Sequence, residues 1–147
     1  MPAVGRPMAA TSDELLAYAG PDFFLDSKEL QQENPEIKGK PFIFGPNFMA
    51  QRIYQLSPLE PANAFTTGNP DEVVMRDAKL LTEERYGSAR RVFVVVQDDQ
   101  AIPAEFQHRM VAQSPGIQVE EIAGADHMAM LSQPEKLVEL LTRIANN

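Results

Sequence analysis

The spacing of hydrophobic positions is most regular after residue 90. Val92–Val96 is a continuous β-branched and aromatic run, typical of a strand buried on both faces of a parallel sheet. A helix is expected from Pro103 to about Gln113, and a second strand over residues 117–122. Residues 132–135 have the spacing of a capping box. They precede a final helix with apolar residues at helical spacing: Leu137, Leu140, Leu141 and Ile144. This order predicts a right-handed βαβα unit.

Before residue 80 the pattern is broken by proline, since nine of the twelve prolines lie there. Short helices are expected over residues 12–18, with Ser12 and Asp13 as capping candidates, and over residues 48–56 and 71–81. Residues 42–44 are expected to form a short strand. These pieces are too short to form a sheet core. We therefore interpret residues 1–82 as a cap or lid segment and residues 83–147 as the C-terminal βαβα part of the core.

Composition narrows the class of protein. A chain of 147 residues with 44% hydrophobic residues can bury one core of ordinary size. Without cysteine it has no disulfide framework and no thiolate metal site. The net charge is −8 and the basic residues are scattered, which argues against nucleic acid as a partner. No apolar stretch near the N-terminus is long enough for a signal peptide or a membrane span. A cytoplasmic protein with no membrane partner is expected.

Candidate chemistry lies at the ends of the two predicted strands. Asp99 follows the first strand and His127 follows the second. Loops at the carboxyl ends of parallel strands meet at one edge of the sheet, so these side chains could meet. A carboxylate on imidazole Nδ1 fixes the tautomer and leaves Nε2 to take a proton from a nucleophile. The pair is two thirds of a Ser-His-Asp constellation, but no Gly-x-Ser-x-Gly elbow is present.

Simpler interpretations remain open at this point. An aspartate after a strand is commonly a turn or helix cap, and Asp98 or Asp99 could merely precede the helix at Pro103. Residues 124–128 could form a tight loop with a histidine that is either exposed or hydrogen-bonded. His108 is expected to face solvent. The aromatic residues of the first half could line a substrate pocket or belong to an ordinary core. No cluster has metal-ligand spacing and no glycine-rich loop suits a phosphate.

Several segments taken together resemble the plant methylesterase and hydroxynitrile lyase family of α/β-hydrolases, which includes methyl salicylate esterases that bind salicylic acid. They are residues 44–46, 54–58, 84–88, 102–107 and 124–131. The similarity extends over the whole chain. It implies the C-terminal half of an α/β-hydrolase fold: a helical cap followed by a βαβα unit of the parallel sheet. We accordingly expect the chain to start within the fold.

The resemblance also implies roles for particular residues. The family's acid falls on Asp99 and its histidine on His127. Its serine, and the His-Gly turn of its oxyanion hole, belong to an N-terminal half that these 147 residues do not include. Residues 65–70 look shorter than in the family. The implied reaction is hydrolysis of methyl esters of salicylate, jasmonate or indole-3-acetate, without a cofactor. Phe24, Phe42 and Met128 are the expected substrate-binding residues.

Alternatives within this resemblance concern both chemistry and assembly. Many hydroxynitrile lyases of the family have a lysine after the histidine, where its charge stabilises departing cyanide. Met128 stands there instead, which favours an esterase over a lyase. A third interpretation is an inactive truncated product that binds an aromatic acid or acts as a decoy. Residues 92–96 are apolar on both faces yet have one predicted neighbouring strand, so a homodimer is an expected means of covering them.

Overall fold

The computed structural model describes residues 8–31, 42–58, 66–67 and 81–147. The chain divides into two compact units, which we describe separately. One comprises Met1–Phe48 and Asn63–Arg90, and the other comprises Met49–Ala62 and Arg91–Asn147. The boundary predicted between residues 82 and 83 stays a prediction.

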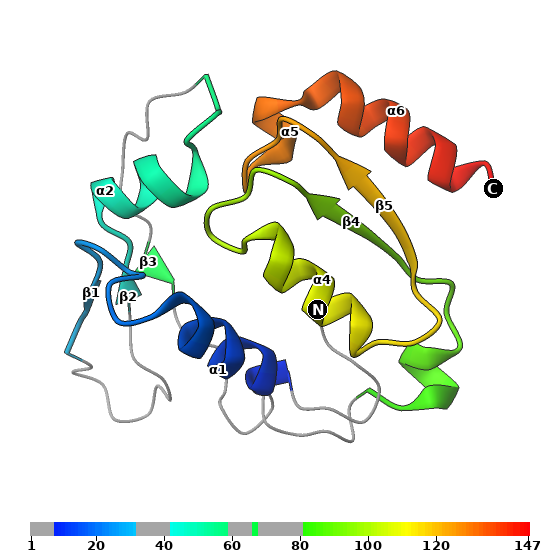
Figure 1. Ribbon diagram of the computed structural model, residues 1–147, viewed down its shortest axis with the longest axis horizontal. Helices are drawn as coiled ribbons and strands as arrows, with labels where there is room; N and C mark the ends of the chain where they lie inside the picture. The colour runs from blue at the N-terminus through cyan, green and yellow to red at the C-terminus, as the bar shows by residue number, and fades with distance from the viewer. Residues whose placement is uncertain (1–7, 32–41, 59–65, 68–80) are drawn as a thin grey trace. The chain divides into compact units, whose positions relative to one another are not determined.

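The second unit contains the parallel strands. β4 (Val92–Val96) pairs with β5 (Gln118–Ile122), with Val92 opposite Gln118 and Val96 opposite Ile122. α4 (Ala104–Ala112) connects the strands, and α5 (Ala129–Ser132) and α6 (Pro134–Ala145) follow β5 (Figure 1). The predicted strand-helix-strand-helix order is therefore confirmed, with α5 as an additional single turn.

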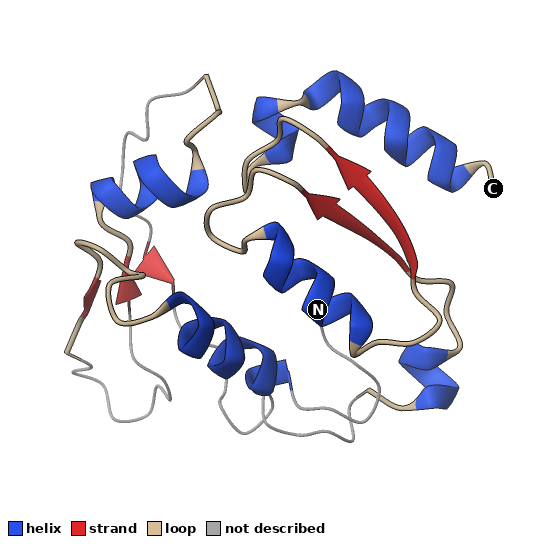
Figure 2. Cartoon of the chain, viewed as in Figure 1, coloured by secondary structure: helices blue, strands red, loops and turns tan. Residues whose placement is uncertain are grey.

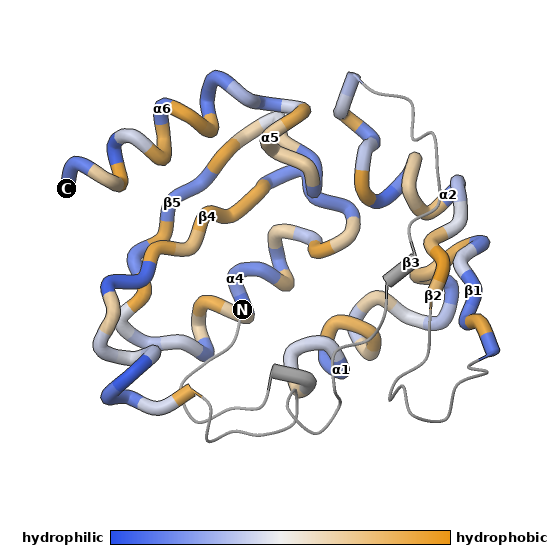
Figure 3. The backbone as a smooth tube through the Cα atoms, turned by 180° about the vertical axis from the view of Figure 1, so that it is seen from behind, coloured by the Kyte–Doolittle hydropathy of each residue, from blue (hydrophilic) through white to orange (hydrophobic). Residues whose placement is uncertain are grey.

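The core of this unit lies between the strands and the last two helices. Its buried residues are Ile122, Ala125, Ala129 and Leu140, and β4 is hydrophobic along its length (Figure 3). Three of the four predicted α6 positions pack here: Leu137, Leu140 and Ile144. Leu141 is instead 50% exposed. The apolar stripe on α6 is therefore narrower than the sequence pattern predicted.

The first unit combines one longer helix with short strands and turns around phenylalanine rings. α1 (Met8–Ala19) precedes an antiparallel sheet of order β1-β2-β3, formed by Lys28–Glu29, Phe42–Ile43 and Thr66–Thr67 (Figure 2). α2 (Pro46–Phe48) and the π-helical turn η3 (Glu83–Gly87) complete it. Successive ring centroids lie 4.8 to 5.9 Å apart in one aromatic cluster: Phe23, Phe24, Phe42, Phe44 and Phe48. Contacts between these rings, most of them edge-on or tilted, thus help to stabilise the unit.

Asp26 fixes the start of α2 from a distant turn. Its carboxylate accepts hydrogen bonds from the backbone N–H groups of Asn47 and Phe48, each at 3.0 Å. These bonds, led by that of Asn47, lower the pKa of Asp26. A Cβ on Gly45 would lie 2.2 Å from Asp26 Oδ1, so a residue without a side chain is needed beside this cap.

Several boundaries differ from the sequence predictions. α1 begins at Met8, because the residues before Ser12 include strong helix formers, so Ser12 and Asp13 are inside the helix rather than at its cap. The helix expected over 48–56 is α2 followed by the π-helical η1 (Met49–Ile53). The helix expected over 71–81 lies outside the described residues, except for its last position.

The predicted capping box before α6 is wrong. The N-cap residue is Gln133, and its side chain makes no capping hydrogen bond. Ser132 instead accepts a hydrogen bond from the backbone N–H of Asp126 at 3.1 Å. A contact with the preceding loop therefore replaces the local cap.

Candidate functional site

The two strand-end loops bring Asp99 and His127 together. Beyond the last strand pair, Gln97 N–H donates to the carbonyl of Ile122 and Asp98 N–H donates to that of Ala125. The parallel pairing thus continues into the loops. Asp99 Oδ2 then lies 2.9 Å from His127 Nδ1. A carboxylate only accepts, so Nδ1 carries the proton and Nε2 is left as the basic nitrogen.

Asp99 has two functions in this geometry. Only 5% of it is exposed, and its Oδ1 accepts hydrogen bonds from the N–H groups of Ala101 and Ile102, each at 2.8 Å. This is the turn that a strand-end aspartate commonly makes. The second oxygen remains available for the imidazole. The turn and the histidine contact therefore coexist, and the turn holds the carboxylate in place for the histidine.

His127 combines a fixed side and an accessible side. The hydrogen bond that Nδ1–H donates to Asp99 is the main cause of a raised pKa of His127. Burial opposes this rise, and the charges of Asp99 and Asp126 add to it. The side chain is 34% exposed. Among the described residues, Nε2 has no hydrogen-bond partner. The imidazole can therefore accept a proton at Nε2 while Asp99 stabilises the imidazolium.

Gly124 shapes the loop that carries His127. Its φ is +75°, in the left-handed region that favours glycine, and a Cβ there would lie 3.1 Å from Gln133 Nε2. Its N–H donates to Asp98 Oδ2 at 2.8 Å, and its carbonyl accepts from Gln133 Nε2 at 2.9 Å. Both backbone groups are thus satisfied, and the turn is tied to the neighbouring loop.

Asp126 is the residue that sequence reasoning missed. Its side chain is fully buried and accepts three hydrogen bonds, from the N–H of Leu56, the hydroxyl of Ser57 and the N–H of Met128. Burial by itself would raise the pKa of Asp126, but these bonds and that with Ser132 outweigh it and lower the pKa. The available signal was an acid adjoining the histidine in a tight turn.

The other candidate residues have less specific surroundings. Phe24 and Phe42 pack against each other in the aromatic cluster, with ring centroids 4.8 Å apart. Met128 is half-buried and precedes α5. Substrate binding by these three residues stays a prediction. His108 is solvent-facing, as expected, with 53% of its side chain exposed and Nε2 3.8 Å from Glu121 Oε1.

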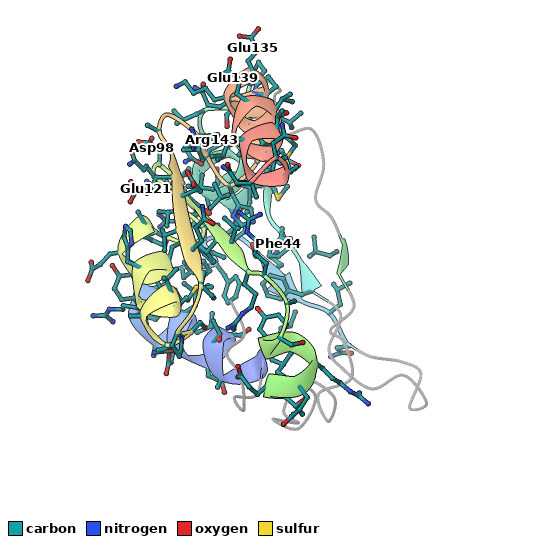
Figure 4. All side chains as sticks on the ribbon, turned by 90° about the vertical axis from the view of Figure 1, so that its right-hand side faces the viewer. Phe44, Asp98, Glu121, Glu135, Glu139 and Arg143 are labelled. Carbon is teal, nitrogen blue, oxygen red and sulfur yellow. The ribbon has the colours of Figure 1, made fainter. Side chains whose placement is uncertain are left out.

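A shallow hollow between β5 and α6 is lined by charged residues, but its cationic side chains already have partners and offer no free group to a ligand. Glu121, Glu139 and Arg143 line it and are labelled in Figure 4. Its cations are engaged, because Arg143 pairs with Glu120 at 2.6 Å and Lys136 donates to the carbonyl of Ala123. In the described part of the chain, no group of acidic and histidine side chains is arranged to hold a metal ion, and no helix is long and apolar enough to span a membrane.

Comparison of the amino-acid sequence with known proteins identifies relatives of this chain. No model of a known protein family matches the chain. It is 42% identical to "Probable esterase PIR7A" of Oryza sativa subsp. indica over 151 residues, covering 99% of the chain and 57% of that protein. It is 41% identical to "Salicylic acid-binding protein 2" of Nicotiana tabacum, covering 84% of the chain and 49% of that protein. It is 38% identical to "Methylesterase 3" of Arabidopsis thaliana, covering 91% and 52%. The chain thus spans about half the length of these relatives.

A solved structure leads to the same group. The crystal structure of polyneuridine aldehyde esterase matches with a TM-score of 0.87 and 32% sequence identity, over 99% of this chain and 58% of that one. The crystal structure of a methylesterase from Arabidopsis matches with a TM-score of 0.69 at 17% identity, which supports the fold alone. The chain therefore belongs to the plant methylesterase family of α/β-hydrolases and matches the C-terminal part of that family's proteins.

Proposed function

We propose that this chain supplies the acid and the histidine of an active site that hydrolyses methyl esters of small carboxylic acids. The observation that carries the proposal is the 2.9 Å contact between Asp99 Oδ2 and His127 Nδ1 at the ends of two parallel strands. Relatives named esterases and methylesterases support the same reaction class. Salicylate, jasmonate and indole-3-acetate methyl esters are the proposed substrates.

In this mechanism Asp99 orients the imidazole and His127 transfers the proton. A serine hydroxyl attacks the ester carbonyl while Nε2 takes its proton, and the protonated ring then gives that proton to the departing methoxide, which leaves as methanol. Water repeats the sequence and releases the carboxylic acid. By the family resemblance, the serine comes from the part of the relatives that these 147 residues do not match.

The substrate-binding part of the proposal rests on apolar side chains. Met128 directly follows His127 and carries no charge, so it suits the hydrocarbon part of an ester better than a departing cyanide ion. Phe24 and Phe42 are proposed as further apolar contacts for the acid. A lyase activity would be detected as cyanide release from a cyanohydrin, and we expect none.

The direct test is a hybrid that joins the unmatched N-terminal part of the rice esterase to this chain. We expect it to hydrolyse methyl salicylate, methyl jasmonate or methyl indole-3-acetate. His127→Ala should lower kcat by about 10³-fold or more, since the proton acceptor is lost. The matched control is His108→Ala, which removes the only other histidine, an exposed one, and should leave the rate unchanged. Wild-type rates in the His127→Ala hybrid, or no hydrolysis by a folded hybrid, would contradict the proposal.

A further inference from the structure

A three-residue segment that is distant in sequence from the two strands makes hydrogen bonds to both loops of the candidate site. We refer to residues 55–57 as the tie segment. Gln55 Nε2 donates to the carbonyl of Asp98, in the loop that follows β4. Leu56 N–H and Ser57 Oγ donate to Asp126 Oδ2, in the loop that follows β5, at 2.9 and 2.8 Å. The tie segment thus bridges the two loops that carry Asp99 and His127.

Asp126 is the centre of this bridge. One of its oxygens faces the tie segment, and the other accepts the N–H of Met128 at 3.0 Å. Its own N–H donates to Ser132 Oγ at 3.1 Å. His127 therefore lies between two residues, Asp126 and Met128, whose backbone N–H groups are both held by hydrogen bonds. Because the carboxylate is fully buried, leaving its donors unpaired would cost free energy, and the loop is held in one conformation.

We infer that Asp126 is a positioning residue, which, through the tie segment, holds His127 at hydrogen-bonding distance from Asp99. It acts through the backbone on either side of His127 and does not touch the reacting atoms. In metal sites, replacing a group that orients a bound imidazole typically costs about 10- to 100-fold in affinity or activity, and a group that orients a catalytic imidazole is expected to have a comparable effect. The inference deepens the proposed function, and its catalytic consequence rests on that function. The positioning itself can be measured without any catalysis.

A charge effect accompanies the positioning. The charges of two carboxylates act on His127: Asp99, from the loop after β4, and Asp126, from its own loop. Both favour the protonated ring. Removing the charge of Asp126 should therefore lower the pKa of His127, whereas removing the Ser57 hydroxyl leaves that charge in place and loosens the loop. Comparing the two variants therefore separates the effect of the Asp126 charge on the pKa of His127 from the effect of the loop's position.

The experiment is NMR of the whole 147-residue chain, in which only His108 and His127 contribute imidazole signals. In Asp126→Asn we expect the pKa of His127 to fall and its Nδ1–H signal to broaden by faster exchange, with His108 unmoved. In Ser57→Ala we expect a broadened Nδ1–H signal, and in Ser57→Thr, which keeps the hydroxyl, the sharp signal of the wild type. Ser88→Ala is the matched control and should change nothing, because among the described residues Ser88 Oγ hydrogen bonds to the carbonyls of Glu84 and Arg85, away from both loops of the site.

Unchanged His127 signals in both Asp126→Asn and Ser57→Ala would overturn the inference. If circular dichroism shows that Asp126→Asn is unfolded, Ser57→Ala and Ser57→Thr decide the matter alone. In the hybrid esterase, Asp126→Asn should lower kcat about tenfold with KM little changed. An inactive wild-type hybrid would count against the proposed function while leaving the NMR result on positioning intact.

Discussion

At the scale of single residues, two buried aspartates fix one histidine in different ways. Asp99 bonds the imidazole directly and is itself held by two backbone N–H groups. Asp126 acts indirectly: its carboxylate accepts the N–H of Met128, directly after the histidine, and the N–H of Leu56 in the tie segment. Carboxylates with several donors are rigid, and rigidity of the orienting group is what proton transfer at a fixed distance requires.

The raised pKa of His127 predicts a pH dependence of stability. Folding favours the protonated imidazole, so its contribution is fully present below the unfolded value of 6.5 and is lost as pH rises through the higher folded pKa. We expect the free energy of unfolding, from urea titrations, to fall over this window by more in the wild type than in His127→Gln. The same dependence in both proteins would show that Asp99 and His127 do not interact as described.

At the scale of elements, a buried glutamine completes one edge of β4. Gln107, on α4, accepts the N–H of Val96 and donates to its carbonyl, each at 2.9 Å, and also donates to the carbonyl of Ile102. The side-chain amide thus makes the pair of hydrogen bonds that a neighbouring strand would make. This contact fixes α4 against the end of the strand that leads to Asp99.

Replacing this amide should destabilise the second unit. Gln107→Leu would remove the hydrogen-bond partner of the half-buried Val96 N–H and one donor to the Val96 carbonyl, which also accepts from the N–H of Asp99 at 3.4 Å. We expect a cost of about 1 kcal/mol or more in the free energy of unfolding. Gln100→Leu makes the same chemical change at an exposed position and should cost little. Chemical denaturation of both variants provides the measurement. Equal stabilities would mean that the amide contributes no more than its apolar replacement.

At the scale of the whole molecule, the described serines do not complete the site. The hydroxyls of Ser57 and Ser132 are engaged with the loop of Asp126, and that of Ser88 contacts its own helical turn. None of the described serines hydrogen bonds to His127. A nucleophile needs a base within hydrogen-bond reach, so the Asp99–His127 pair has no serine to activate among these residues.

We therefore predict that the 147 residues alone react little with a fluorophosphonate probe. Labelling measured by intact mass should be far below one probe per chain, because no hydroxyl is activated by His127. The hybrid esterase should be labelled close to stoichiometrically, and its heat-denatured form should not. Stoichiometric labelling of the chain by itself would contradict the prediction and would direct attention to its own serines.

The sequence by itself determined the parallel strands, the two longer helices of the second unit and the positions of Asp99 and His127. Each depends on local pattern: β-branched runs, helical spacing, and the rule that parallel strands end at one edge. The resemblance added the reaction class. Tertiary structure alone decided the roles of Asp126, Ser132 and Gln107. Their hydrogen-bond partners are set by folding, and in the case of Asp126 and Leu56 they lie 70 residues apart, beyond the reach of any local pattern.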